Sequence, residues 1–351
     1  MKIKVNKNRY IGKNEAPYII AELGSNHNGD MDLAKKLIDS AKKAGADCVK
    51  FQSWSKETIF SKIKYEENYF LADDYRNRDD YSLEEIVDEF AISEEQLIQM
   101  RNYSQEIGID FTSTPFSKRE ADFMVEKLNV DFIKVASMDL NNYQFLDYVA
   151  NKGKPIILST GLSSLAEIDK AVSVIESAGN DQLVILHCVA IYPPEDKQIN
   201  LNNIDSLQKI YQYPIGFSDH SLGTCIPIAA MAKGACVIEK HFTLDKEMFG
   251  WDHKVSANEE DMEVITNAAH RIFTALGTSR IQRMEEDDRL ESFRRSIVAS
   301  RSIKEGEIFT NSMLDFKRPG RGLAPEALDF IVGKVAKRNI EYDELINMQD
   351  F

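Results

Sequence analysis

The sequence lacks any long apolar run. No stretch approaches the roughly 18 apolar residues that a membrane-spanning helix needs, and no apolar segment follows the charged start MKIKVNKNRY as it would in a secretion signal. We therefore expect a protein that is neither embedded in a membrane nor exported.

Cysteine is also scarce. Cys48, Cys188, Cys225 and Cys236 are the only four, they form no CxxC pair, and three of them lie in or beside apolar runs. This usage argues against a disulfide scaffold and favours reduced thiols in a cytoplasmic protein.

Positive charge is in deficit, with 43 Lys and Arg against 57 Asp and Glu and a formal net charge of −14. No block of Lys and Arg interrupts the acidic residues, so nucleic acid and anionic membranes are excluded as expected partners. A few lysines gathered in a cleft can still bind a small anion, because the local potential there is set by near neighbours.

Glycine-rich phosphate loops are absent, since neither GxGxxG nor GxxxxGK occurs. Their absence argues against an open nucleotide-binding sheet. Instead the chain repeats a short β-branched run, a polar loop and an amphipathic helical stretch. Eight such units over about 260 residues predict an α/β fold of the (β/α)₈ TIM-barrel type. The predicted strands are 18–23, 48–53, 109–114, 132–137, 155–160, 183–188, 214–219 and 236–242.

The spacing of apolar residues predicts helices in MDLAKKLIDSAKKAGA and in SLAEIDKAVSVIESAG, the second with Ser163 or Ser164 as its N-cap. The segment 54–95 is longer than an ordinary connection and rich in aromatic and charged residues, which is typical of a lid or a specificity element.

After Gly277 the alternation of strand and helix patterns ends, and short β-like pieces with turn signals follow from Ser296 onwards. We predict a barrel domain over 1–280, a linker over 281–295 and a small β-rich domain over 296–351. The segment MEEDDRLESFRRS within the linker region is either a polar linker or an exposed helix. The small domain is short enough to need packing against a barrel, its own or a partner's.

The carboxyl ends of barrel strands face the active site, so polar residues there belong together. Lys50 and Lys134 lie at two strand ends, and hydroxyls from Thr114, Ser137, Ser159 and Ser218 lie at others. Ammonium and hydroxyl groups donate to oxyanions, which indicates a site for phosphate or carboxylate, although a solvated surface is the alternative.

His220 and His241 follow two neighbouring predicted strands, in IGFSDH and CVIEKHF. Two imidazoles so placed can share one divalent metal with open positions for substrate, or they can be ordinary hydrogen-bonded histidines. We favour structural roles for His27, which can cap the GSNHNG turn, and for His187, which lies within an apolar strand.

Carboxylates occupy the same strand ends. Glu22 and Glu239 can act as acid or base in the barrel mouth, or can hold lysines and water in place. Asp252 follows soon after His241 and can belong to the site or to a turn.

The order of these motifs resembles the sialic acid synthase family, whose members condense phosphoenolpyruvate with an N-acetylated hexose to give a nine-carbon 2-keto acid. The tail, with SIVASRSIKEGEIF and FKRPG, resembles the small antifreeze-like or SAF domain that follows the barrel in this family. The matching motifs are IIAELGSNHNGD, ADCVKFQS, TSTPFS, IKVASMD, KPIILSTG, LHCVAIYP, GFSDHSLG, GACVIEKHFTLD and GWDHKVS.

The resemblance implies that His220 and His241 hold Mn²⁺ or Mg²⁺ and that Glu22 handles the proton of an attacking water. It implies that Arg318 reaches the active site of a partner subunit, in a domain-swapped homodimer. Residues around phosphoenolpyruvate would be Lys50, Thr114, Lys134, Ser137, Ser159 and Ser218. Residues lining the sugar and metal region would be Gln52, Phe116, Asp139, Tyr192, Glu239 and Asp252.

Several positions depart from the members that make N-acetylneuraminate. Met138 and Asp139 stand where Gly-Glu is frequent, Ala190 where Asn is common, and Trp251 where GPD is usual, and Arg78 lies near a position that often carries a sugar-binding Asn. These departures bear on the acceptor: N-acetylmannosamine is one expectation, and a 2,4-diacetamido-2,4,6-trideoxyhexose, leading to legionaminic- or pseudaminic-type acids, is the other.

Two other functions remain open on the sequence. Lys50 or Lys134 inside a barrel could form a Schiff base, as in an aldolase. Alternatively, an inert barrel with a recognition tail could be a carbohydrate-binding protein.

Overall fold

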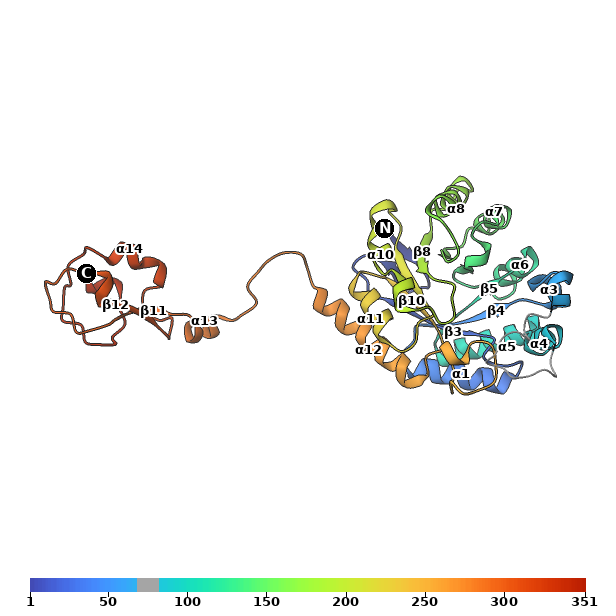
Figure 1. Ribbon diagram of the computed structural model, residues 1–351, viewed down its shortest axis with the longest axis horizontal. Coiled ribbons are helices and arrows are strands. Elements are labelled where there is room, and N and C mark those ends of the chain that lie inside the picture. The colour runs from blue at the N-terminus through green and yellow to red at the C-terminus, as the bar shows by residue number, and fades with distance from the viewer. Residues whose placement is uncertain (68–81) are drawn as a thin grey trace. The chain divides into compact units, whose positions relative to one another are not determined.

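The structure, a computed structural model, describes residues 1–67 and 82–351. It forms two compact units, Met1–Gly277 and Thr278–Phe351, which Figure 1 draws with their connecting segment. Each unit is described here by itself.

The first unit contains a sheet of eight parallel strands in the order β5-β4-β3-β10-β9-β8-β7-β6. Between β5 and β6 the Thr112 hydroxyl donates to the Phe132 carbonyl at 2.9 Å, so the sheet is a nearly closed barrel. This confirms the predicted (β/α)₈ fold. The strands are β3 Tyr18–Gly24, β4 Cys48–Ser53, β5 Asp110–Pro115, β6 Ile133–Val135, β7 Ile156–Ser159, β8 Leu183–Cys188, β9 Ile215–Asp219 and β10 Val237–His241.

Helices alternate with these strands and surround them (Figure 1). Of the two N-cap candidates, Ser164 caps α8, because its side chain accepts from the backbone N–H of Glu167. The helices are α1 Met31–Lys43, α2 Lys56–Ile59, α3 Lys62–Glu67, α4 Leu83–Phe90, α5 Glu94–Ile107, α6 Lys118–Glu126, α7 Tyr143–Ala150, α8 Leu165–Ser177, α9 Asp196–Ile199, α10 Asn202–Ile210, α11 Cys225–Ala232 and α12 Glu259–Leu276, with short 3₁₀ turns η3 Ser137–Asp139 and η4 His253–Val255.

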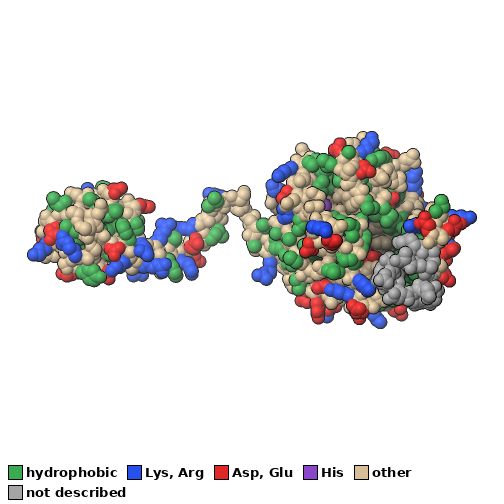
Figure 2. Space-filling view, viewed as in Figure 1, with side chains coloured by type: hydrophobic (Ala, Val, Ile, Leu, Met, Phe, Trp, Pro, Cys, Tyr) green, Lys and Arg blue, Asp and Glu red, His purple; other side chains and the backbone are tan. Residues whose placement is uncertain are grey.

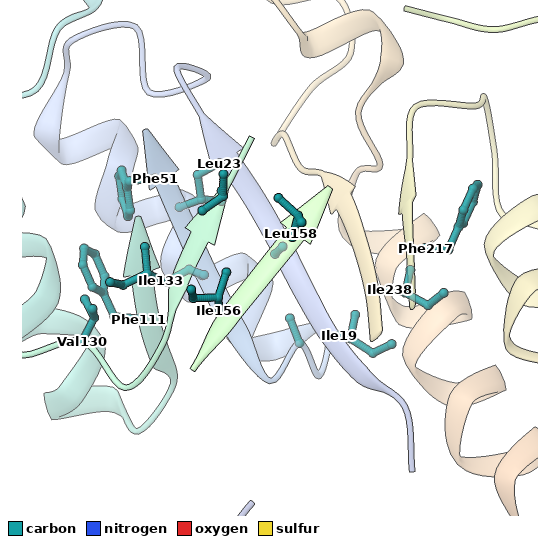
Figure 3. Packing of buried hydrophobic residues seen from close by; sticks show 14 of the residues in the cluster. Ile19, Leu23, Phe51, Phe111, Val130, Ile133, Ile156, Leu158, Phe217 and Ile238 are labelled. Atoms are coloured by element: carbon teal, nitrogen blue, oxygen red, sulfur yellow. The ribbon is translucent and has the colours of Figure 1, made fainter. Parts of the chain in front are cut away.

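The pleat of the strands divides their side chains between two environments. Residues such as Ile19, Phe51 and Ile238 belong to one buried apolar cluster with residues of the surrounding helices, and Figure 3 shows this packing from close by. Tyr18, Ile20 and Val237 alternate with them and form a second cluster.

The second cluster also contains Ile3 and Ile11, from an antiparallel hairpin of β1 Lys2–Lys4 and β2 Tyr10–Gly12. This hairpin therefore packs against the amino-terminal ends of the strands. Gly216 of β9 belongs to this tight interior, because a Cβ there would lie 2.5 Å from Leu186 Cδ2. The opposite, carboxyl end of the barrel is free to carry polar side chains.

The second unit is small. Strands β11 Ser296–Ala299 and β12 Leu314–Lys317 pair antiparallel, and Ile297, Phe309, Ile331, Ile340 and Ile346 form its buried core. Its remaining elements are α13 Asp287–Phe293, η5 Asn311–Met313, η6 Pro325–Ala327, α14 Leu328–Ile331 and η7 Met348–Asp350. Helix α13 lies within the range 281–295, where the sequence predicts a polar linker or an exposed helix.

Figure 2 shows acidic and basic side chains interspersed over the visible face of the first unit. Within the described ranges, no helix is both long and apolar enough to cross a membrane. The long connection predicted over 54–95 contains α2, α3 and α4, whereas Arg78 lies outside the described residues.

Candidate active site

A pocket of about 580 Å³ opens at the carboxyl ends of the barrel strands. It brings together most of the site residues predicted from the sequence, because inward positions two residues apart on each strand point into the same space. The predicted residues that line it are Glu22, Lys50, Gln52, Thr114, Phe116, Lys134, Ser137, Ser159, Tyr192, Ser218, His220, Glu239, His241 and Asp252.

A buried cluster of four charges forms the floor of this pocket. Lys50 Nζ lies 2.6 Å from Glu22 Oε2 and 3.7 Å from Glu239 Oε2. Lys134 Nζ lies 3.7 Å from Glu239 Oε1. Lys50 also donates to the Thr114 hydroxyl at 2.9 Å. The lysines are thus not solvated surface groups, and both point toward the centre of the barrel mouth.

The two carboxyl groups have different proton affinities. Burial raises the pKa of Glu22 from its usual 4.5 to about 7, and the neighbouring Glu239 charge adds to this while Lys50 opposes it. For Glu239 burial acts in the same direction, but Lys134 and Lys50 outweigh it and hold its pKa below the usual value. Glu22 is therefore the carboxyl that changes protonation near neutral pH.

The two histidines face each other at the mouth, with ring centroids 5.5 Å apart. The Nδ1–H of His220 donates to the Val189 carbonyl at 2.8 Å, and the thiol of Cys188 neighbours the same ring. His241 Nδ1 lies 3.7 Å from Asp252 Oδ2. Burial, followed by the charges of His220 and the lysines, lowers the pKa of His241 well below its usual value, so its imidazole is neutral.

These donors fit a divalent ion with few protein ligands. Within residues 1–67 and 82–351 no group of three or more His, Cys, Asp or Glu is arranged to hold a metal. Such an ion would have the two imidazoles as its protein donors and would keep open positions for water and substrate. His241 Nδ1 is buried and, in the part of the chain that the structure describes, has no hydrogen-bond partner.

One further buried atom points to a ligand. Ser159 Oγ has no hydrogen-bond partner among the described residues. Since buried polar atoms are nearly always satisfied, this hydroxyl in the pocket indicates that a bound molecule supplies its partner.

Two predicted residues are not part of this pocket. Asp139 does not line it, and its carboxylate accepts instead from Asn142 Nδ2 at 3.4 Å, at the start of α7. Arg318 belongs to the second unit, where its exposed guanidinium lies 4.9 Å from the centroid of the Phe293 ring.

The other two strand-region histidines have structural contacts, in line with the preferred reading of them. His27 Nδ1 accepts from the backbone N–H of Gly29 at 3.1 Å within its turn. The His187 ring bonds the Ile199 carbonyl at 2.6 Å and packs near Phe217.

Sequence reasoning missed the apolar wall of the pocket, which includes Trp54, Ile59, Phe60 and Leu162. The rings of Trp54 and Trp251 lie 5.6 Å apart. The aromatic residues just after the second barrel strand were the available signal, because the loops after strands border the active site.

It also missed Cys188, which lines the pocket. Burial opposes ionisation of its thiol, but the neighbouring His220 outweighs burial and lowers the Cys188 pKa. The alternation that places Leu186 inside the barrel could have found it.

Several known proteins are similar to this chain over most of its length. The chain is 37% identical over 331 residues to N,N'-diacetyllegionaminic acid synthase of Campylobacter jejuni, covering 93% of this chain and 98% of that one. It is 42% identical over 350 residues to an uncharacterized protein of Methanocaldococcus jannaschii, covering 99% and 98%. The crystal structure of an N-acetylneuraminic acid (sialic acid) synthetase from Leptospira borgpetersenii in complex with citrate superposes with a TM-score of 0.73 at 32% identity, covering 82% of this chain and 94% of that one.

Family models match both parts of the chain. The SAF domain model matches residues 294–351, which confirms the resemblance of the tail. The NeuB family model matches residues 37–281, and the chain therefore belongs to the NeuB family.

Proposed function

We propose that this chain is a metal-dependent synthase that condenses phosphoenolpyruvate with an N-acetylated hexose, releases phosphate and forms a nine-carbon 2-keto acid. It would be a phosphoenolpyruvate-dependent transferase that forms a C–C bond. The observation that carries the proposal is the meeting of Lys50 and Lys134 with His220 and His241 in one pocket, since it combines an anion site with donors for a Lewis acid.

In this proposal the phosphoenolpyruvate oxygens take the inner half of the pocket. Lys50 and Lys134 supply charge, and hydroxyls such as the unpartnered Ser159 Oγ supply directed donors. Gly161 N–H donates to Ser137 Oγ at 3.0 Å, which holds that hydroxyl at the pocket edge.

The acceptor would lie between the imidazoles and the outer wall. A divalent ion held by His220 and His241 would polarise the aldehyde oxygen. Tyr192, whose ring stacks 4.0 Å from that of His220, closes one side of this space and orients the aldehyde. Holding both substrates in one pocket replaces a bimolecular encounter with an intramolecular reaction.

The bond changes follow from these positions. C3 of the enol attacks the aldehyde carbon, and the aldehyde oxygen takes up a proton to become the new hydroxyl. Positive charge develops at C2 near the carboxylates of Glu22 and Glu239, and water adds at C2. Loss of phosphate then breaks the C–O bond of the tetrahedral intermediate, and the remaining proton of the C2 hydroxyl leaves as the ketone forms. Glu22 takes the proton of the attacking water, a role that suits a carboxyl with a pKa of about 7.

The wall of the pocket favours one class of acceptor. Trp54, Ile59, Phe60, Phe116 and Trp251 line the pocket, and an apolar surface suits the methyl groups of a 2,4-diacetamido-2,4,6-trideoxyhexose better than the hydroxymethyl group of N-acetylmannosamine. The relative from Campylobacter jejuni, a legionaminic acid synthase, agrees with this choice, whereas the synthetase from Leptospira leaves N-acetylmannosamine as the alternative acceptor.

We further propose that a homodimer completes the site, with the SAF domain of each chain serving the other. Arg318 is the candidate group. Its guanidinium is exposed, and the ion pairs found among the described residues do not include it.

The test is phosphate release from phosphoenolpyruvate in the presence of Mn²⁺, with N-acetylmannosamine beside the diacetamido sugars. Turnover with a diacetamido sugar supports the proposal in full, and turnover with N-acetylmannosamine alone corrects the acceptor. Without release for any sugar, the synthase is refuted. Borohydride trapping of pyruvate on Lys134, whose pKa burial lowers, would then identify an aldolase.

A further inference from the structure

Strands β9 and β10 carry a second ion pair on the face directed away from the pocket. Asp219 and Lys240 are direct partners in the parallel register of the two strands. Their side chains are 0% and 1% exposed, and Lys240 Nζ lies 2.6 Å from Asp219 Oδ2. Neither residue lines the pocket, so neither touches substrate.

This pair also fixes the backbone next to His220. Asp219 Oδ1 accepts from the backbone N–H of Ser221 at 2.9 Å, and Lys240 Nζ donates to the Ser221 carbonyl at 2.6 Å. The pair therefore holds both backbone polar groups of Ser221, the residue that follows His220. Lys240 itself directly precedes His241.

The same two strands are joined on their inner face one position earlier. Ser218 Oγ donates to Glu239 Oε1 at 2.9 Å, and Ser218 pairs with Glu239 in the register. The strand ends are thus connected on both faces immediately before the two imidazoles.

We propose that Asp219 and Lys240 are positioning residues that set the separation of His220 and His241, and with it the affinity of the site for a divalent ion. The inference rests on the proposed role of the two histidines as metal donors. Its physical basis is that groups behind metal ligands hold them in the binding geometry, and that their loss weakens metal affinity by about 10- to 100-fold.

The alternative is that the pair stabilises only the fold. Buried ion pairs give weak net stability, and their joint replacement by uncharged residues of similar size is often neutral, whereas removing one partner leaves a buried unpaired charge. The informative variant is therefore Asp219→Asn/Lys240→Met, which removes both charges together and keeps an acceptor for the Ser221 N–H.

The experiment measures Mn²⁺ binding to chelator-stripped protein by the electron paramagnetic resonance signal of free Mn²⁺. Wild type should bind one ion and His220→Ala should not. In the double variant we expect the Kd for Mn²⁺ to rise about 10- to 100-fold, and saturating Mn²⁺ to restore kcat to within a few-fold.

Tyr18→Phe is the matched control. It removes a partly buried hydrogen bond of 2.6 Å to Asp110 Oδ2 at the other end of the barrel. It should lower the melting temperature without changing the Kd for Mn²⁺.

A wild-type Kd in the double variant overturns the inference, as does an equal rise in Tyr18→Phe. If the double variant does not unfold cooperatively, Asp219→Asn/Lys240→Gln, which also leaves no unpaired charge, decides by the same Kd. Absence of Mn²⁺ binding in wild type overturns the metal role as well, so the two failures are distinguishable.

Discussion

Replacing Glu22 by Gln should separate activity from stability. Glutamine keeps the shape of the protonated carboxyl and can still meet Gln52, whose Nε2 donates to Glu22 Oε1 at 2.9 Å. Lys50 keeps Glu239 as a partner at 3.7 Å. The change therefore removes the proton acceptor while it preserves most of the surrounding contacts.

The expected loss of activity follows from the proposed role. Removing a general base lowers kcat by about 10²- to 10⁴-fold, which corresponds to about 3 to 5 kcal/mol on the barrier. Because Glu22 must be ionised to accept a proton, wild-type kcat/KM for phosphoenolpyruvate should rise with pH and level off above the Glu22 pKa of about 7. In the Gln variant that rise should disappear.

Stability should change in the opposite direction. Because the pKa of Glu22 in the folded protein lies above its usual 4.5, the free energy of unfolding falls as pH rises from 4.5 through 7. At 1.36 kcal/mol per pKa unit, a rise from 4.5 to about 7 means that the ionised carboxyl costs about 3 to 4 kcal/mol above pH 7. The neutral Gln avoids this cost, so the variant should be more stable than wild type at alkaline pH and about equal near pH 4.5.

The assays are phosphate release across the pH range and urea unfolding at both pH extremes. Asp47→Asn is a matched control, since burial also raises the pKa of Asp47 but the residue does not line the pocket. It should alter the pH dependence of stability and leave kcat unchanged. The reasoning fails if Glu22→Gln keeps wild-type kcat, or if it is less stable than wild type at alkaline pH.

Further outcomes are expected from the same site. His220→Ala or His241→Ala should abolish phosphate release by removing a metal donor, and wild-type turnover in either would contradict the metal assignment. Chelation should inactivate the enzyme and Mn²⁺ should restore it; activity that survives exhaustive chelation would count against a metal. Ser159→Ala should raise the KM for phosphoenolpyruvate about 2- to 10-fold with little change in melting temperature, because its hydroxyl has no hydrogen-bond partner among the described residues; an unchanged KM would remove Ser159 from the anion site. Arg318→Ala should raise the KM for the sugar more than the KM for phosphoenolpyruvate. A larger rise in the KM for phosphoenolpyruvate would contradict the proposed place of Arg318 beside the sugar.

The barrel could be predicted from sequence because its signals are local. Each strand is a short apolar run that ends in polar residues, and in a parallel barrel all such ends meet on one face. Glu239 and His241 are two residues apart on one strand, and residues with that spacing lie on the same face. This rule alone predicts that both side chains enter the pocket. The clustering of Lys50 and Lys134 follows from the same rule.

Other features depend on geometry that the sequence does not carry. Asp139 lies in a 3₁₀ turn after β6. In such a turn successive side chains point in different directions, so the exact position in the turn decides whether a side chain faces the pocket. The carboxylate of Asp139 faces away from the pocket and accepts from Asn142. Trp54 and Trp251 lie about 200 positions apart in the chain, so their contact is a product of the closed barrel. The pairing of Asp219 with Lys240 likewise required the register of two strands.

The formal charges of the four-residue cluster on the pocket floor cancel, with two ammonium and two carboxylate groups. Phosphoenolpyruvate brings between about 2.5 and 3 negative charges near pH 7, from one carboxylate and one phosphate. An anion arriving beside Glu22 makes its ionised form less favourable, so binding near neutral pH should draw a proton from solution. The heat of binding should then depend on the ionisation enthalpy of the buffer, and the proton taken up must leave Glu22 again before this carboxylate accepts the proton of the attacking water.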